Sequence, residues 1–462
     1  MKLMAFTAVV TTGIYCRPGC PATPLRRNMA PYLTAAAAEA NGYRACLRCR
    51  PDREPEPGWI DAPELVCRAL RLIADGGLDG ATEDELAARL GVSARHLRRL
   101  FDTHVGATPG EVARSRRTHF ARRLLDDTDL TLAAVARAAG FSSVRHMNRL
   151  VQQVFKATPT ELRAKRRNPT RNVADGGLEL RLPYRPPLAW DTMLAFLAPR
   201  AIPGVEAVDQ ADRAYRRTID LDGDPGVIEL TAPPGESFLV LRAHLPRIED
   251  LVHVVARVRR QFDLDADPQR IDAHLSGDRL LRPLVRRHPG LRVPGAFDPV
   301  EVGVRAILGQ QVTVAGATRL AGRLVERYGR PVPGLEELGL SYLFPTAETL
   351  AGAPLDDIGI TTARSRAIRA FAAATFRRSV PLDGSQDLAT VVEELCDLPG
   401  IGDWTAQYVA MRAGGERDAF PAGDLGLRKV LGLSTPREAL TRAESWRPWR
   451  AYAALHLWTS GD

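Results

Sequence analysis

The stretch from Leu398 to Asp424, LPGIGDWTAQYVAMRAGGERDAFPAGD, limits the fold of this chain more than any other. Its two glycines, Gly400 and Gly402, flank one apolar residue just ahead of an amphipathic segment. Glycine permits the positive φ of a tight turn and the close approach of another backbone. Because the segment 387–397 also has a helical pattern, the sequence predicts a helix, a hairpin and a second helix.

A turn of this kind directs backbone N–H groups outward at the start of a helix, where they can bind phosphate. Each part of the stretch also has an ordinary explanation. A Gly-x-Gly before a helix is often only a helix start, and Asp424 stands where the run Leu425 to Leu431 would have its N-cap. Trp404 and Tyr408 lie four residues apart and share one helix face, which suits core packing as well as ligand stacking.

Together with Trp458, this stretch resembles the helix-hairpin-helix DNA glycosylases, and most closely the AlkA-type 3-methyladenine glycosylases. The resemblance extends from Leu178 to Asp462 and includes the terminal WRPWRAYAALHLW. It implies an enzyme of the DNA-3-methyladenine glycosylase II type, which hydrolyses the N-glycosidic bond of alkylated purines. It also implies that Gly400 and Gly402 bind DNA through the hairpin.

The same resemblance implies roles for single residues. Asp424 would be the catalytic carboxylate, which stabilises positive charge on the sugar or orients a water. Trp404, Tyr408 and Trp458 would stack on the flipped, cationic base. Gln311, in ILGQQVTVAGA, stands where the family inserts a side chain into the duplex. Relatives that also cut the strand have a lysine at the position of Trp404, and since tryptophan forms no imine, we expect a monofunctional glycosylase.

Four cysteines near the start have the spacing of a metal site: Cys16, Cys20, Cys46 and Cys49. Pairs at three- and two-residue spacings fit a tetrahedral zinc site, with two disulfides as the competing interpretation. The surrounding TTGIYCRPGC and NGYRACLRCRPD resemble the methylphosphotriester-sensing domain of Ada-type proteins. This resemblance implies one Zn²⁺ held by the four cysteines, and suicidal transfer of a methyl group from a DNA phosphate to Cys16. Only MKLM precedes the part that matches, so we expect an N-terminally short sensor.

An internal repeat marks the next segment. The sequence ATPGE at 107–111 recurs as ATPTE at 157–161, and each copy follows a helix-turn-helix pattern with Ser93 or Ser142 as the expected N-cap of the second helix. The doubled unit, with GFSSVRHMNRLVQQVFKATPTELR, resembles the AraC/XylS DNA-binding domain, whose two recognition helices would enter successive major grooves. The arginines expected to bind DNA are Arg95, Arg98, Arg99, Arg145 and Arg149.

The chain is therefore expected to be multidomain and mainly α-helical. We predict a small α+β zinc domain at 1–52, an all-α double helix-turn-helix domain at 62–167, a small antiparallel sheet domain at 178–265, and an α-helical helix-hairpin-helix domain at 266–462. The stretches 51–61 and 165–177 break the helical pattern and are predicted to be linkers. After residue 248 only helices are expected.

Net positive charge is concentrated in the first third of the chain, where residues 1–170 contain 27 Lys and Arg against 17 Asp and Glu. This imbalance favours double-stranded DNA as a partner. An activator would also contact RNA polymerase. No segment is long and apolar enough for a membrane span, and cysteines at metal spacing favour a reducing cytoplasm. We expect a monomer.

These features predict a sensor of methylphosphotriesters and transcriptional activator fused to a glycosylase for alkylated DNA. Two other functions fit the same residues. The glycosylase part could only bind DNA within a transcriptional regulator, in which case no base would be released. Alternatively, the front modules could only anchor a glycosylase to DNA, which promoter-specific binding would contradict.

Overall fold

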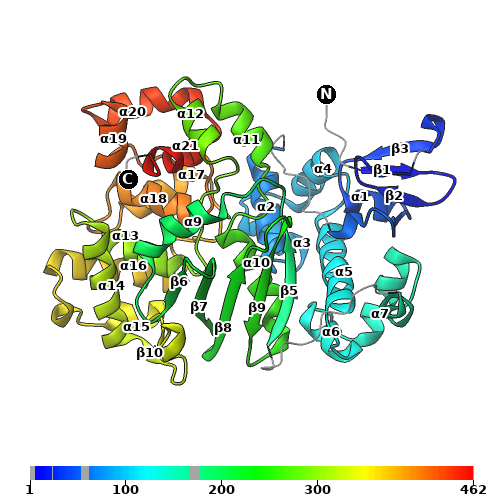
Figure 1. The fold of residues 1–462 in the computed structure, drawn as a ribbon, viewed down its shortest axis with the longest axis horizontal. Helices are drawn as coiled ribbons and strands as arrows, with labels where there is room; N and C mark the ends of the chain where they lie inside the picture. Colours follow the sequence, from blue (N-terminus) through cyan, green and yellow to red (C-terminus); the bar gives the residue numbers. More distant parts are fainter. Residues whose placement is uncertain (1–5, 23, 54–61, 166–176, 461–462) are drawn as a thin grey trace. The chain divides into compact units, whose positions relative to one another are not determined.

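The computed structural model describes residues 6–460 except 23, 54–61 and 166–176 (Figure 1). The chain forms two compact units. The first comprises residues up to Tyr184 together with Leu245–Ala256, and the second comprises Arg185–His244 together with the residues from Arg257 onward. The residues ahead of Phe6, where the sensor was expected to be short, lie outside the described residues, as do most of the two predicted linkers.

A small sheet with one helix begins the first unit, as expected for the zinc domain. Its strands are β1 (Phe6–Val9), β2 (Ile14–Cys16), β3 (Met29–Tyr32) and β4 (Arg44–Ala45), in the order β3-β1-β2-β4. β1 pairs antiparallel with β2 and β3, whereas β2 and β4 are parallel. The helix α1 (Ala35–Ala40) begins at Thr34, whose side chain accepts a hydrogen bond from the N–H of Ala37.

In the described residues up to Lys165, seven α-helices follow α1. They are α2 (Glu64–Ala74), α3 (Glu83–Arg89), α4 (Ala94–His104), α5 (Pro109–Asp127), α6 (Leu132–Ala138), α7 (Val144–Phe155) and α8 (Pro159–Ala164). The two helix-turn-helix units are α3–α4 and α6–α7, and the long helix α5 joins them. β5 (Leu178–Pro183) also falls in this unit.

Capping explains the repeated ATPxE sequence. The side chains of Thr108 and Thr158 each accept a hydrogen bond from the backbone N–H three residues on, and the carboxylates of Glu111 and Glu161 accept one from the N–H of the same threonine. Both copies are therefore capping boxes with proline in the first turn, one starting α5 and the other α8. Ser93 caps α4 as predicted, but Ser143 caps α7, one residue after the serine we expected.

The second unit contains an antiparallel meander. It consists of β6 (Glu206–Asp209), β7 (Ala214–Leu221), β8 (Asp224–Thr231) and β9 (Phe238–His244), paired in chain order. Buried residues alternate along the strands, for example Ile228 and Leu230 on β8, because one face packs on the core. The helix α9 (Trp190–Leu197) precedes these strands, although only a sheet was predicted for this segment.

The rest of the described second unit is helical apart from one short antiparallel pair, β10 (Arg330–Pro331) with β11 (Tyr342–Leu343). Only helices were predicted after residue 248, so this pair was not expected. The helices are α10 (Leu251–Gln261), α11 (Pro268–Leu275), α12 (Leu281–Arg287), α13 (Pro299–Leu308), α14 (Val314–Tyr328), α15 (Ala347–Gly352), α16 (Thr362–Phe376), α17 (Leu388–Cys396), α18 (Asp403–Arg412), α19 (Leu425–Leu431), α20 (Pro436–Ala443) and α21 (Arg450–Trp458). α10 begins within the residues assigned to the first unit.

The centre of these helices is tightly packed. α13 contacts both α16 and α18, and a Cβ at Gly303 of α13 would collide with the ring of Phe371 on α16. The mainly helical multidomain fold is thus confirmed. Among the described residues, none of the helices has the length and apolar character that crossing a bilayer requires.

Candidate functional site

The predicted hairpin lies between α17 and α18. Asp387 caps α17, and Gly402 is the N-cap of α18, where no side chain of the described residues supplies a capping bond. Gly400 has a φ of +80°, and a Cβ there would lie 2.9 Å from that of Ala367. Only glycine fits this turn without strain, and the first N–H groups of α18 stay available for an anion.

Asp424 is both the N-cap of α19 and the acceptor of two indole N–H groups. Its Oδ1 accepts hydrogen bonds from the backbone N–H of Leu427 at 2.9 Å and from Nε1 of Trp458 at 3.1 Å. Its Oδ2 accepts one from Nε1 of Trp404 at 3.0 Å. These three donors fix the carboxylate in one orientation. Each carboxylate oxygen has about two acceptor sites, so Oδ2 keeps one for a further group.

This carboxylate lies in a cavity of about 1070 Å³. The cavity collects the predicted glycosylase residues, namely Gly400, Gly402, Trp404, Tyr408, Asp424, Trp458 and Gln311. Trp404 and Tyr408 stack with centroids 5.6 Å apart and planes at 20°, and the ring of Trp458 lies 6.1 Å from that of Tyr408. An aromatic wall and one oriented carboxylate therefore face the same space.

Three arginines around Tyr408 were not predicted. Arg412 donates a hydrogen bond of 2.7 Å to the phenol oxygen, and Arg200 and Arg305 line the cavity. Burial acts to raise the pKa of Tyr408, but the charges of Arg412, Arg200 and Arg305 outweigh it and lower that pKa. Arg412 follows Tyr408 by four residues on α18, and this spacing was the signal that could have identified it.

The neighbouring glutamines, Gln310 and Gln311, differ in their surroundings. The Nε2 of Gln310 donates to the carbonyl of Gly400 at 2.9 Å and to the hydroxyl of Thr405 at 3.0 Å, so this side chain ties the end of α13 to the hairpin. Gln311 is exposed, lines the cavity and has a φ of +56°. A left-handed conformation is uncommon for glutamine and marks a constrained position.

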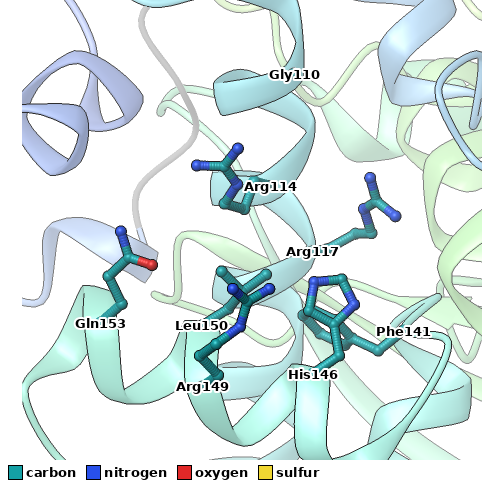
Figure 2. A pocket seen from close by; sticks show the side chains of 8 residues that line it. All are labelled: Gly110, Arg114, Arg117, Phe141, His146, Arg149, Leu150 and Gln153. Atoms are coloured by element: carbon teal, nitrogen blue, oxygen red, sulfur yellow. The ribbon is translucent and has the colours of Figure 1, made fainter. Parts of the chain in front are cut away.

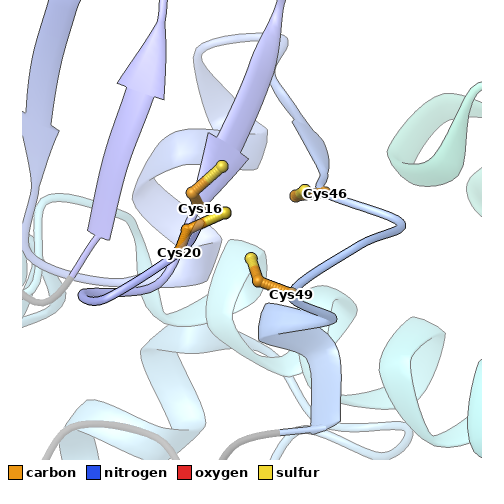
Figure 3. A group of neighbouring side chains, drawn as sticks. All are labelled: Cys16, Cys20, Cys46 and Cys49. Atoms are coloured by element: carbon orange, nitrogen blue, oxygen red, sulfur yellow. The ribbon is translucent and has the colours of Figure 1, made fainter. Parts of the chain in front are cut away.

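The four cysteines meet in the first unit (Figure 3). Their sulfurs lie within 4.8 Å of one another, Cys16, Cys46 and Cys49 are buried, and all four are free thiols, so no disulfide forms among them. A tetrahedral zinc with Zn–S of about 2.3 Å places its sulfurs about 3.8 Å apart. Burial, followed by the neighbouring cysteines, raises the pKa of the Cys16 thiol. The four cysteines therefore fit a single site for a divalent cation that binds thiolates, as zinc does.

Two polar clusters join the segments that carry these cysteines to α5. In the first, the hydroxyl of Tyr15 donates to Glu39 Oε1 at 2.7 Å, and the same oxygen lies 2.5 Å from His119 Nε2 on α5. Burial acts to lower the pKa of His119, but the carboxylates of Glu39 and Asp52 outweigh it and raise that pKa. Tyr15 directly precedes Cys16, so the metal site is mechanically connected to this helix.

The second cluster is centred on Asp126 of α5, which is only 3% exposed. Arg50 lies 2.6 Å from both Asp126 and Asp52, and Arg122 pairs with Asp126 at 3.0 Å. Arg50 follows Cys49 directly, so both halves of the cysteine cluster are anchored on the helix that joins the two helix-turn-helix units.

The predicted DNA-binding arginines lie on the second helices of the two units. Arg95 and Arg99 on α4 and Arg145 and Arg149 on α7 are exposed. Arg98 is also exposed, but its Nε donates to Glu83 of α3 at 2.6 Å, so it has a counter-charge within its own unit.

Four family models match the chain. They are the metal-binding domain of Ada at 3–52, a helix-turn-helix domain at 86–165, the AlkA N-terminal domain at 179–298 and the HhH-GPD superfamily of base excision DNA repair proteins at 304–451. The chain is 45% identical over 461 residues to the probable bifunctional transcriptional activator/DNA repair enzyme AlkA of Mycobacterium tuberculosis, covering 98% of this chain and 92% of that protein.

Two further similarities cover about 60% of the chain, and both are to 3-methyladenine DNA glycosylases. The DNA-3-methyladenine glycosylase 2 of Escherichia coli is 36% identical over 282 residues, which are 60% of this chain and 95% of that enzyme. The solved structure of a 3-methyladenine DNA-glycosylase from Archaeoglobus fulgidus superposes with a TM-score of 0.54 at 23% identity, over 61% of this chain and 97% of that one. At this identity the superposition shows a shared fold.

Proposed function

The chain belongs to the family of bifunctional AlkA-type transcriptional activators and DNA repair enzymes, and on that basis we propose which residues perform each activity. The family membership establishes an alkylation-damage protein with a 3-methyladenine DNA glycosylase, an Ada-type zinc domain and a helix-turn-helix domain. DNA is its partner. We propose a cytoplasmic monomer that also contacts RNA polymerase when it activates transcription.

The glycosylase site uses Asp424 against the sugar. As the base departs, positive charge develops on the deoxyribose, and a fixed carboxylate stabilises this charge or orients the attacking water. The observation that supports this role is the clamping of Asp424 by Trp404, Trp458 and Leu427, with one acceptor site of Oδ2 remaining. Because these three hydrogen bonds orient the carboxylate before the substrate binds, the site needs little reorganisation in the transition state.

The aromatic rings of Trp404, Tyr408 and Trp458 bind the flipped base. An alkylated purine is cationic, and a cation over an aromatic face is attracted by the ring quadrupole. The hairpin with Gly400 and Gly402 binds a phosphate through the N–H groups of α18, and Gln311 enters the duplex at the vacated position.

The reaction ends with intact abasic DNA. The cavity lining contains no lysine among the described residues, and Trp404 occupies the position where strand-cutting relatives have one. A Schiff base to the sugar therefore has no amine to form it. DNA treated with a methylating agent tests this function, because the protein should release methylated purines, identified by mass spectrometry, and leave abasic sites in unbroken strands. Unbroken DNA with no released base would instead favour a regulator that only binds DNA.

The zinc domain repairs methylphosphotriesters at Cys16. The Cys16 sulfur attacks the methyl carbon, the methyl–oxygen bond breaks, the phosphodiester leaves as an anion and a thioether remains. Cys16, Cys20, Cys46 and Cys49 would hold a Zn²⁺ that keeps them as thiolates, and methylation of Cys16 would then change the formal charge of the site from −2 to about −1. The reduced repulsion lets the domain approach phosphates while α4 and α7 read a promoter.

Mass spectrometry after incubation with methylphosphotriester DNA tests the acceptor. Cys20 is the most exposed of the four cysteines, whereas Cys16 is 7% exposed, so accessibility alone would favour Cys20. A single methyl group on Cys16 supports the proposal. A methyl group on Cys20, or on none of the four, contradicts it.

A further inference from the structure

A second pocket lies in the first unit, between α5 and α7 (Figure 2). Its volume is about 350 Å³, which is at the lower end of the range for small-ligand sites. Arg114 and Arg117 come from α5, and His146, Arg149 and Gln153 come from α7. Buried Phe141 and Leu150 form its apolar wall.

The lining is strongly cationic. Arg117 has one carboxylate nearby, that of Asp79 at 3.5 Å. Arg114 and Arg149 are exposed, and within the described part of the chain neither side chain has an ion pair. Burial, followed by the charges of Arg149, Arg117 and Arg114, lowers the pKa of His146. Among the described residues, three positive side chains therefore converge with one counter-charge, which is the electrostatic signature of an anion site.

The location indicates which anion. α5 joins the two helix-turn-helix units, and α7 is the second recognition helix. A duplex that places successive major grooves on α4 and α7 must pass its backbone across the helix between them. Arginine clusters bind phosphate through charge-assisted hydrogen bonds, and such contacts set the position of the duplex and do not read its sequence.

We propose that Arg114, Arg117, His146 and Arg149 form a phosphate-binding pocket that holds the DNA backbone between the two recognition helices. This inference rests on the proposed DNA binding by α4 and α7, and it adds a contact that neither recognition helix makes alone. Free phosphate or a small phosphate ester has the same chemistry, so the experiment includes it as a second source of the ligand.

The test compares Arg114→Gln with Arg116→Gln in the full-length, zinc-loaded protein. Arg116 lies on the same helix and does not line the pocket. The duplex is one that the wild-type protein selects from a random pool, and its dissociation constant is measured across a salt series. Losing one phosphate contact should reduce the log–log salt slope by about 0.9. The ratio of the variant's dissociation constant to that of wild type should therefore be about eightfold larger at 0.1 M salt than at 1 M salt. Arg116→Gln should keep the wild-type slope, and Arg114→Lys should restore most of it.

Neutral methylphosphonate linkages, introduced one at a time, locate the contact. Wild type should lose affinity at one linkage to which Arg114→Gln is insensitive. Saturable binding of inorganic phosphate that Arg114→Gln abolishes, with an unchanged DNA slope, assigns the pocket to a free anion. Equal behaviour of Arg114→Gln, Arg116→Gln and wild type in all three measurements overturns the pocket. Failure of the wild-type protein to select any duplex would instead contradict the proposed promoter binding.

Discussion

Replacing Asp126 with Asn should loosen the zinc domain from α5. Asp126 is 3% exposed and faces Arg50 at 2.6 Å and Arg122 at 3.0 Å. Arg50 keeps Asp52 as a partner, so the charge that loses its ion pair is that of buried Arg122, and breaking a buried ion pair from one side costs about 3–5 kcal/mol. Because the Asn amide oxygen still accepts one hydrogen bond, we expect the lower value, about 3 kcal/mol. For a unit of this size, each kcal/mol shifts Tm by about 2–4 °C, which gives a decrease of about 6–12 °C.

The two units can be followed separately in the intact protein. The described tryptophans, Trp190, Trp404, Trp446, Trp449 and Trp458, all belong to the second unit. The sixth tryptophan of the sequence, Trp59, falls in the residue range of the first unit, so both proteins also carry Trp59→Phe. In this background tryptophan fluorescence should report an unchanged transition in Asp126→Asn, whereas calorimetry should show the other transition at lower temperature. The control is Asp102→Asn, an exposed carboxylate on α4. A shift below about 2 °C, or an equal shift in the control, would refute the proposed role of Asp126.

Three further outcomes follow from the contacts described above. Trp404→Phe keeps the ring that stacks on Tyr408 but removes the N–H donor to Asp424, so base release should fall by about tenfold while duplex affinity is unchanged; an unchanged rate would show that the indole N–H does not act on the carboxylate. Borohydride should trap no covalent complex with damaged DNA, and a strand break proportional to base release would contradict the monofunctional assignment. The pKa of His119 is raised by Glu39 and Asp52, against burial and the charge of Arg123, so its stabilising contribution should be complete below about pH 6.5 and disappear as pH rises through the folded-state pKa. The difference in unfolding free energy between wild type and His119→Gln should accordingly shrink from pH 6 to pH 9, and a difference that grows would refute this sign.

The hairpin and the cysteine cluster could be predicted because their chemistry is local. Positive φ at Gly400 follows from the Gly-x-Gly pattern, and two pairs of cysteines with three and two residues between their members favour a metal site. The repeated ATPxE sequences were recognised as a repeat, and capping boxes at Thr108 and Thr158 explain them physically.

Long-range packing decides the features that the sequence did not reveal. Trp404 and Trp458 were expected to stack on a base, and their second role, holding Asp424 through their N–H groups, depends on how α18, α19 and α21 pack. The contact between Arg50 and Asp126 joins residues 76 positions apart. Gln310 and Gln311 are neighbours of the same residue type, so the sequence does not distinguish them. In the structure the side chain of Gln310 bonds to the hairpin, whereas Gln311, with its positive φ, is exposed.

The rate of base release by Asp424→Asn tests whether this carboxylate performs the chemistry. The substitution retains the N-cap position of α19 and removes the charge, and Asp356→Asn, at an exposed carboxylate outside the cavity lining, serves as the matched control. Under single-turnover conditions with methylated duplex DNA, we predict a loss of at least about 10²-fold, with binding to an abasic duplex unchanged and the control at the wild-type rate. Release of methylated purines by Asp424→Asn within about threefold of wild type would contradict the assignment of Asp424 as the catalytic carboxylate.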